Sequence, residues 1–352
     1  MSRSHLALTL LSVSLVACTG SSSGSGDDGP APPFTNGVST LAGAGDPGFV
    51  DGDRDVARFN NPTNVAVGPD GNVYVADWQN GKIRVVAPDG TTSTLVAQMG
   101  FARPFGLAFA GQTLYATTDS NGSGTHTPMT TGSVWQIDIH SGVATELANA
   151  IGLPRGIAAL ADGRLALGDY ENHVVELLDP RTGAVTVLAG SFGVPGYADG
   201  VGGAARFTAP YGLVQRSDGK LVVVDQGNNR LRVVGLDGTV TTLAGTGQAG
   251  YADGAMTGGM FDEPQGIAID GNDNLYITDL GNYRVRRIVG STIDTIAGDG
   301  TAGYVDDDDR LSAELYGLEG LAVTKDGSMV YVADGTRGDD VPFNRVRQVK
   351  MQ

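Results

Sequence analysis

The chain repeats a unit of four short segments in which apolar residues alternate with polar ones. The most regular copy spans 263–298 and contains the runs Gly-Ile-Ala-Ile-Asp, Leu-Tyr-Ile-Thr-Asp, Arg-Val-Arg-Arg-Ile and Thr-Ile-Asp-Thr-Ile-Ala. Alternation over such short runs, bounded by Gly, Asn and Asp, is typical of β-strands joined by tight turns. No apolar period of about 3.6 residues persists long enough to predict a helix bundle. The pattern therefore predicts an all-β fold.

Six copies of the unit align on an aspartate that closes the second segment. These residues are Asp77, Asp119, Asp169, Asp225, Asp279 and Asp334. The last copy ends after its third segment, and a segment that matches the missing fourth, Val38–Gly43, precedes the first copy. If this segment completes the last sheet, the sheets close into a ring without an open edge. The sequence thus predicts a six-bladed β-propeller over 37–352, with the N-terminal strand closing the last blade.

Three motifs carry a family resemblance: Pro-x-Gly-Ile-Ala-Ile-Asp at 264–270, Asn-Leu-Tyr-Ile-Thr-Asp at 274–279 and Asn-x-Arg-Val-Arg at 282–286. In these motifs the chain resembles NHL-repeat β-propellers over 38–352. The second and third copies depart from the pattern because they lack the paired arginines of the third segment. The resemblance implies the fold and no single function, since propellers serve many functions.

We interpret the six aligned aspartates as architectural. Each precedes a turn, and its carboxylate can accept hydrogen bonds from the backbone N–H groups of that turn. Each could also meet the arginine that opens the next segment, as at Arg230, Arg284 and Arg345. Because one ligand rarely needs six equivalent groups, we expect functional residues where the copies differ.

Four links that lead into a new copy are long, whereas the links into the second and third copies are short. The long links are 45–61, 190–209, 245–263 and 298–317. In propellers of this family they share a face with the links between second and third strands, of which 120–132 is long. Function commonly lies on such loops, although the inserts could instead pack over the seams between blades. One face is therefore decorated, with a gap over blades two and three.

One position at the expected channel mouth differs in every copy. It is the second residue of the innermost strand, and its occupants are Thr63, Phe105, Arg155, Tyr211, Gln265 and Glu319. Architectural copies would be alike, whereas these residues mix aromatic, cationic, anionic and neutral polar groups. We predict this ring as the candidate ligand-binding site. An unconstrained surface would show the same variety, and that alternative stays open.

The N-terminal 36 residues follow a different pattern. The apolar run Leu6–Ala17 is too short to span a bilayer and is typical of a signal peptide over 1–17. Leu-Val-Ala-Cys, ending at Cys18, resembles the lipobox of bacterial lipoproteins, which implies lipidation of Cys18 by diacylglycerol. Residues 18–36 are rich in Gly, Ser and Pro and are predicted to be a flexible tether. Because Thr19 rather than Asp follows Cys18, we expect the outer membrane rather than the inner one.

The charge and the cysteine content narrow the functions. The net charge is −16, with 39 acidic against 23 basic residues. Nucleic-acid binding needs clustered Lys and Arg, so we expect no nucleic-acid partner. A basic or apolar ligand, or a divalent cation, fits this charge better. The single cysteine excludes a disulfide within the chain.

The sequence offers few catalytic groups. Amidating lyases, which share this propeller class, bind zinc through several channel histidines. Here His126, His140 and His173 fall on loops or at strand ends. Within the predicted propeller, 37–352, there is no Gly-x-Ser-x-Gly motif for a nucleophilic serine. We therefore expect no enzyme of these kinds.

Calcium is the one cofactor for which the sequence supplies ligands. Asp306 and Asp308 offer carboxylates, and Asn64 offers an amide oxygen near the mouth. Gluconolactonase-like propellers hold a divalent ion in the channel through Glu, Asn and Asp, and Glu319 and Asn64 lie at roughly similar positions. The set is incomplete.

The sequence thus predicts a monomeric, lipid-anchored propeller of the cell envelope. It would bind or scaffold a protein, peptide or glycan through the loop-decorated face, over blades two and three. The alternative is a calcium-dependent hydrolase or lyase of the gluconolactonase-like kind, with its site at the channel mouth.

Overall fold

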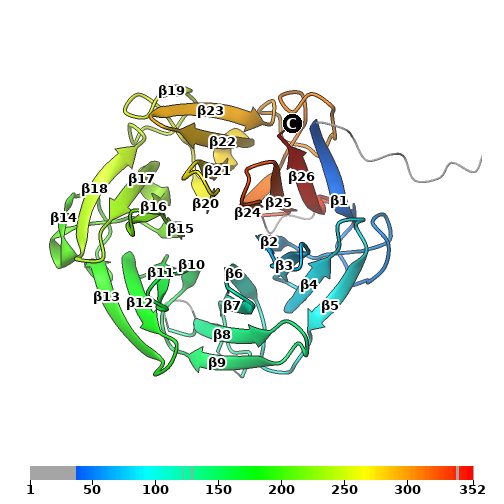
Figure 1. The fold of residues 1–352 in the computed structure, drawn as a ribbon, viewed down its shortest axis with the longest axis horizontal. Helices are drawn as coiled ribbons and strands as arrows, with labels where there is room; N and C mark the ends of the chain where they lie inside the picture. The colour runs from blue at the N-terminus through cyan, green and yellow to red at the C-terminus, as the bar shows by residue number, and fades with distance from the viewer. Residues whose placement is uncertain (1–36, 122, 128–129, 338–340, 352) are drawn as a thin grey trace, which may run out of the picture. The chain divides into compact units, whose positions relative to one another are not determined.

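The computed structural model describes residues 37–121, 123–127, 130–337 and 341–351. Over these residues the chain forms six antiparallel sheets around a central axis, as Figure 1 shows. The predicted six-bladed β-propeller is therefore confirmed. The signal segment, Cys18 and the tether lie outside the described residues.

Each blade runs from an innermost to an outermost strand along the chain, except that β1 is the outermost strand of blade six. The strands are, in blade one, β2 (Pro62–Val67), β3 (Val73–Asp77), β4 (Lys82–Val86) and β5 (Thr92–Val96); in blade two, β6 (Pro104–Ala110), β7 (Thr113–Thr118), β8 (Ser133–Asp138) and β9 (Ala144–Ala148); in blade three, β10 (Pro154–Ala159), β11 (Leu165–Asp169), β12 (Val174–Asp179) and β13 (Ala184–Gly190); in blade four, β15 (Pro210–Gln215), β16 (Leu221–Asp225), β17 (Arg230–Val234) and β18 (Thr239–Ala244), with β14 (Gly200–Val201) at its edge; in blade five, β20 (Pro264–Ile269), β21 (Leu275–Asp279), β22 (Arg284–Val289) and β23 (Thr292–Ala297), with β19 (Gly254–Ala255) at its edge; and in blade six, β24 (Gly317–Val323), β25 (Met329–Gly335), β26 (Asn344–Lys350) and β1 (Gly37–Gly45). Three short 3₁₀ turns complete the elements: η1 (Gly202–Ala204), η2 (Gln226–Asn228) and η3 (Leu280–Asn282).

The N-terminal strand closes the ring as predicted. Strand β1 pairs antiparallel with β26, from Gly37 opposite Lys350 to Gly45 opposite Asn344. The first and last strands of the described chain thus share one sheet, and this pairing removes the edge that β26 would otherwise expose.

Glycines let the innermost strands approach one another. A Cβ added at Gly212 would lie 2.7 Å from the carbonyl oxygen of Gln265, and one at Gly266 would lie 2.8 Å from that of Glu319. Side chains cannot fit at these distances, so packing between the innermost strands requires glycine at these two positions.

The register of the second strands corrects the alignment of Asp119. In four blades the aspartate pairs with the first residue of the third strand, as Asp225 does with Arg230, and in blade six Asp334 pairs with Arg345, the second residue of β26. In blade two Thr118 takes that place, opposite Ser133, and Asp119 lies one residue beyond β7. Because neighbouring side chains point in opposite directions, Asp119 is free for a different role.

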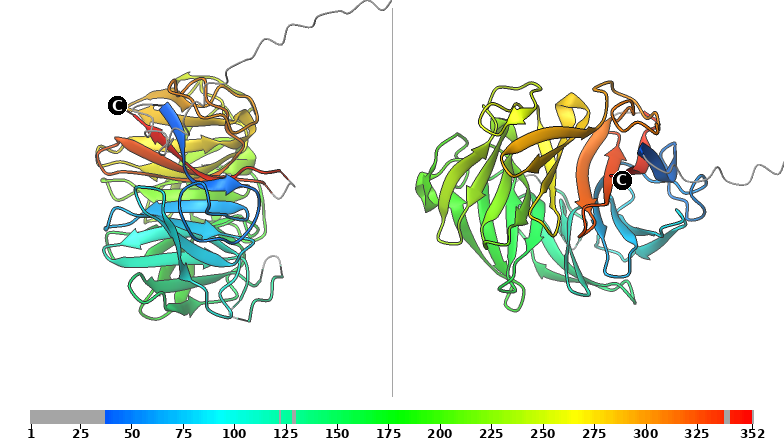
Figure 2. Two further views of the ribbon diagram at one scale, coloured as in Figure 1. Left: turned by 90° about the vertical axis from the view of Figure 1, so that its right-hand side faces the viewer. Right: turned by 45° about the horizontal axis from the view of Figure 1, so that its top comes forward.

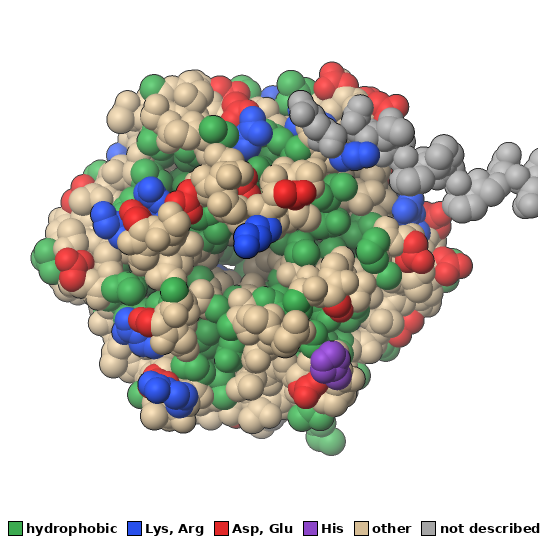
Figure 3. All heavy atoms as spheres, viewed as in Figure 1, with side chains coloured by type: hydrophobic (Ala, Val, Ile, Leu, Met, Phe, Trp, Pro, Cys, Tyr) green, Lys and Arg blue, Asp and Glu red, His purple; other side chains and the backbone are tan. Residues whose placement is uncertain are grey.

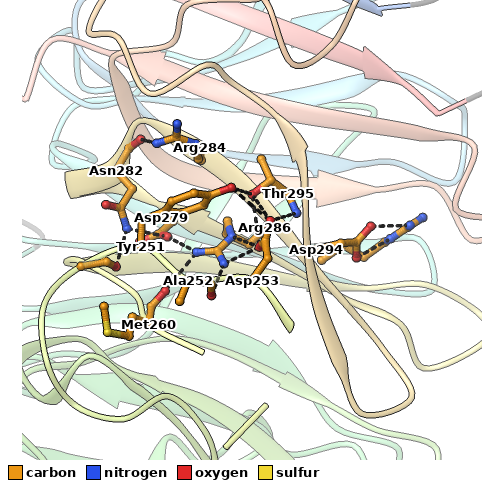
Figure 4. Close-up of polar contacts among 12 residues, drawn as sticks. Tyr251, Ala252, Asp253, Met260, Asp279, Asn282, Arg284, Arg286, Asp294 and Thr295 are labelled. Carbon is orange, nitrogen blue, oxygen red and sulfur yellow. Dashed lines mark hydrogen bonds and ion pairs between the residues drawn. The ribbon is translucent and has the colours of Figure 1, made fainter. Parts of the chain in front are cut away.

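A buried arginine anchors each long insert to its blade. In blade five (Figure 4), Arg286 donates to Asp279 Oδ2 and to Asp253 Oδ1, both at 2.6 Å, and to two carbonyls of the insert. The hydroxyl of Thr295 also donates to Asp253, at 3.0 Å. We call this Asp–Arg–Asp–Thr set the insert clamp. It recurs as Asp77, Arg84, Asp51 and Thr94 in blade one; as Asp225, Arg232, Asp199 and Thr242 in blade four; and as Asp334, Arg347, Asp306 and Thr40 in blade six.

The clamp uses a different arginine from the one expected. Asp225 binds Arg232, at 2.7 Å, whereas Arg230 lies over the ring of Tyr197, 3.9 Å from its centroid. Blades five and six repeat this arrangement. The expectation that the aspartates meet the first arginine of the third strand is therefore wrong: the second arginine pairs with the aspartate, and the first lies over the tyrosine ring of the insert.

The inserts also cover the outer edges of their blades. Strand β14 pairs with β18 and β19 pairs with β23, while single bridges join Gly52 to Thr92 and Val38 to Asp307. All four long inserts thus pack on the outer edges of their own blades, whereas the packing alternative placed them over the seams between blades.

We predict that Arg232→Met destabilises the fold by about 3–5 kcal/mol, because it leaves Asp225 buried without its cation. The matched control is Arg181→Met, since the Arg181 side chain is 85% exposed and pairs with Asp179 at the surface. Such exposed pairs contribute about 0–1 kcal/mol. Urea denaturation measures both variants, and equal losses would contradict the role assigned to the clamp.

Candidate functional site

The structure brings part of the predicted ring together at the channel mouth. Arg155, Tyr211, Glu319 and Asn64 line one small cavity of about 50 Å³. The guanidinium of Arg155 also lies over the ring of Phe105, 3.9 Å from its centroid. Four of the six predicted ring residues are therefore neighbours.

Asp119 binds the cation at the centre of this group. Its Oδ2 lies 3.1 Å from Arg155 Nη1, and both side chains are largely buried. The indole N–H of Trp78 donates to the same oxygen, at 3.0 Å. Arg155 is thus held between a carboxylate and an aromatic face, which fixes the orientation of its remaining N–H groups.

Aromatic rings form the wall beside Arg155. Phe105 and Tyr211 meet edge to face with centroids 5.6 Å apart, and Tyr211 meets Tyr170 in the same way at 5.9 Å. Such packing keeps the rings rigid. The mouth therefore presents apolar faces next to a fixed positive group.

Burial changes the acid–base properties of the mouth. It raises the pKa of Glu319 to about 7; the nearby Arg155 charge opposes this rise and Asp119 reinforces it. Burial likewise raises the pKa of Tyr211 well above its ordinary value. Glu319 can consequently be neutral or charged near pH 7, and a cationic ligand would favour the charged form.

Two buried acceptors at the mouth have no hydrogen-bond partner among the described residues. They are Asp119 Oδ1 and Gln265 Oε1. Buried polar atoms are normally paired, and an unpaired one costs free energy. A donor from a ligand or from water would satisfy them.

Thr63 does not take part in the site. It is buried, and its hydroxyl donates to the carbonyl of Pro104, at 3.2 Å. It holds the innermost strands of blades one and two together.

The sequence interpretation missed a second ring of mouth residues. Trp78, Asp119 and Tyr170 each follow the last residue of the second strand in blades one, two and three. The same position is occupied by Gln226, Leu280 and Gly335, where Gly335 is still within β25. The variety at this position was a usable signal, but the misalignment of Asp119 by one residue concealed it.

The loop after β7 is anchored to the same group. His126 Nδ1 lies 2.6 Å from the Asp119 carbonyl oxygen, and the Thr131 hydroxyl donates to that oxygen at 3.2 Å. Figure 2 shows the described parts of this loop and of the link after β25 on the same side of the ring. The long loop of blade two is therefore held next to Asp119 at the mouth.

Beyond the mouth the channel is apolar. Aliphatic side chains from all six innermost strands, such as Val65, Ile157 and Leu321, line a cavity of about 470 Å³. In Figure 3 hydrophobic side chains lie near the central opening, and a basic side chain stands at its edge. Polar recognition groups are thus concentrated at the mouth.

The predicted calcium ligands have different surroundings. Asp306 is held by Arg347, at 2.6 Å, and lies with Asp308 in the insert of blade six. Asn64 accepts the N–H of Val65 through its own side-chain oxygen and shares the small cavity with Glu319. Within the described ranges no group of three or more His, Cys, Asp or Glu side chains could hold a metal ion. Calcium binding stays a prediction.

Comparisons with known proteins agree with the repeat pattern. The NHL repeat model matches residues 59–86 and 261–288. The chain is 26% identical to Protein SUPPRESSOR OF QUENCHING 1, chloroplastic, of Arabidopsis thaliana, over 70% of this chain and 27% of that protein. It is 25% identical to NHL repeat-containing protein 2 of Homo sapiens, over 69% of this chain and 41% of that protein. The chain therefore spans less than half the length of these curated relatives.

A solved structure shares the fold. It is an auxiliary nutrient binding protein from Bacteroides thetaiotaomicron, with a TM-score of 0.69 and 17% identity, covering 89% of this chain and 75% of that one. The chain thus carries NHL repeats on a six-bladed β-propeller. In the part of the chain that the structure describes, no helix has the length and apolar character needed to cross a membrane.

We predict that Glu319→Gln stabilises the protein above about pH 7. The folded pKa of about 7 exceeds the ordinary value of 4.5, so between these values the folded protein holds a proton that the unfolded chain releases. Stability is lost as the pH rises through this range, by up to about 1.4 kcal/mol per pH unit, and glutamine abolishes the loss.

Thermal unfolding from about pH 5 to about pH 8 measures this effect. The melting temperature of Glu319→Gln should rise relative to that of the natural protein as the pH increases. Asp55→Asn, at an exposed acid, is the control. A difference that stays constant with pH would contradict the prediction.

Proposed function

We propose that this protein is a binding module of the cell envelope whose channel mouth recognises a protein, peptide or glycan partner. The Arg155–Asp119 pair carries the proposal. An ion pair held rigidly among aromatic rings at an opening is suited to orienting a ligand, since the fixed N–H groups give direction and the rings give contact area.

The composition of the mouth supports recognition of a mixed polar and apolar group. Arg155 offers a cation, Glu319 an acid with a pKa of about 7, and Gln265 an unpaired acceptor. Phe105, Tyr211 and the other rings supply flat apolar faces. Sugars and peptide side chains both combine these two kinds of surface.

The likeness to an auxiliary nutrient binding protein extends to the fold alone. The argument for binding therefore comes from the mouth of this chain, where the copies differ most. The repeated residues are accounted for by the insert clamps, which leaves the mouth residues as the ones that architecture does not explain.

Lipid anchoring belongs to the same proposal. The lipobox at Cys18 and the tether that follows would hold the propeller at a membrane surface, at the outer rather than the inner membrane. A diacylglycerol anchor leaves the folded body in water and free to meet partners.

We expect Arg155→Met and Trp78→Phe to weaken ligand binding by at least about tenfold, because each removes a group that orients the mouth. The labelled full chain is first screened against glycan and peptide arrays, and the strongest probe is then titrated by calorimetry. Arg181→Met is the control, because this exposed residue lies away from the mouth on blade three. A probe that binds both mouth variants as tightly as the natural protein would place the site elsewhere.

We expect Cys18→Ser to release the protein from membranes. Without the thiol no thioether to diacylglycerol can form, and the tether alone has no apolar run that could anchor it. Membrane flotation of the natural and variant chains measures the effect. Unchanged flotation of Cys18→Ser would refute the anchor and would leave the binding proposal untouched.

A further inference from the structure

Blade three carries an acid where four blades carry the clamp arginine. Glu176 of β12 pairs with Leu167 and Val187 on the flanking strands. In blade four Arg232 holds the same place, between Val223 and Thr242. An acid therefore replaces the base at the clamp position of blade three.

Glu176 has no compensating group. Glu176 is 6% exposed, and its Oε2 is buried without a hydrogen-bond partner in the described part of the chain. Burial, together with the negative charge of Asp169, raises the pKa of Glu176 to about 8. An unpaired acid at this depth costs stability unless a cation or a proton accompanies it.

Asn172 also lacks a partner that the equivalent asparagine of blade four has. In blade four the equivalent Asn228 donates to Asp225 and also to the Gly196 carbonyl of the insert. Asn172 donates to Asp169 alone, at 2.7 Å, and its Oδ1 is buried without a partner. The groups that hold an insert elsewhere are therefore present in blade three, although the link into this blade, 149–153, is too short to reach them.

The outer edge of blade three has no strand partner among the described residues, although η1 of the blade-four insert lies beside β13. Strand β18 of blade four pairs with β14 of its insert, whereas within the described ranges no strand pairs with the outer side of β13. Val187, which takes the place of the clamp threonine, is 48% exposed. An exposed strand edge can accept an extended segment by backbone hydrogen bonds.

Blade two lacks an insert as well but offers no such site. Its clamp position holds Trp135, which is buried and whose indole N–H donates to Thr118 Oγ1 at 3.0 Å. The tryptophan fills the position and is satisfied. The unmatched acid is a property of blade three.

We propose that blade three binds an extended segment of a partner polypeptide that carries an arginine. The segment lies along the outer edge of β13 in the place of the missing insert, and its guanidinium pairs with Glu176 beside Asp169. In the four clamps an aspartate of the insert meets an arginine of the third strand. In blade three an arginine of the partner would meet an acid of the third strand, so the two residue types are exchanged. This site is separate from the channel mouth and does not depend on the function proposed for it.

A designed peptide tests the proposal. It copies residues 196–202 of the blade-four insert, Gly-Tyr-Ala-Asp-Gly-Val-Gly, with arginine in place of the aspartate. A second peptide carries citrulline, which has nearly the shape of arginine without its charge. Calorimetry with the full chain in detergent should show the arginine peptide binding at least about tenfold more tightly than the citrulline peptide.

Matched variants separate this site from general attraction by the acidic protein. Glu176→Gln should abolish the preference for arginine, whereas Asp55→Asn removes one exposed acid elsewhere and should preserve it. Arg155→Met should preserve it too, which distinguishes failure here from failure of the mouth. Equal binding of the two peptides by the natural protein, or an undiminished preference in Glu176→Gln, would overturn the proposal.

A charge exchange gives a second readout. Glu176→Arg should favour the original aspartate peptide over the arginine peptide, because it recreates the clamp found in the other blades. If this variant fails to fold, Glu176→Gln and the citrulline peptide still decide the question. A folded Glu176→Arg that continues to prefer the arginine peptide would count against the site.

Discussion

The buried arginine of the insert clamp is the interaction on which this structure depends. Removing a charge from water costs several kcal/mol, and only close partners with good geometry offset that cost. Arg232 has two carboxylates and two carbonyl oxygens around its guanidinium, and its side chain is fully buried. One side chain therefore joins the second strand, the third strand and the insert, and the insert in turn covers the outer edge. Where the arginine is absent, in blades two and three, the insert and the edge cover are absent together.

The insert clamps also determine which charged groups remain available to partners. Four blades use their repeated charges on themselves, so these acids and bases are not available to partners. Arg155 of the mouth group and the unmatched Glu176 both belong to blade three, which has no insert, on β10 and on β12 respectively. Loss of the clamp is thus the local change that makes room for recognition on an otherwise regular ring.

The sequence predicts the fold well because the pattern of the four-strand unit occurs six times. The alternation, the Pro-x-Gly motif and the displaced Val38–Gly43 strand require a closed ring, and β1 pairs with β26 as expected. The site was only partly predictable. Four of the ring residues are neighbours, but Asp119 was read as architectural, since a shift of one residue in a strand exchanges its two faces and a pattern of letters does not reveal it. The clamp arginine and its insert aspartate are 33 residues apart in three blades and 41 in blade six, so no local pattern could pair them.

The contrast between blades two and three shows that losing an insert does not by itself explain Glu176. If the clamp position had only been released from its role, an apolar or self-satisfied residue would serve there, as Trp135 does in blade two. A buried acceptor left unpaired costs about 1–3 kcal/mol, and blade three has two of them, Glu176 Oε2 and Asn172 Oδ1. A domain with a few kcal/mol to spare can carry that cost, but packing alone gives no reason for it. A cationic partner gives such a reason, because its N–H groups would donate hydrogen bonds to both oxygens and its charge would balance that of Glu176.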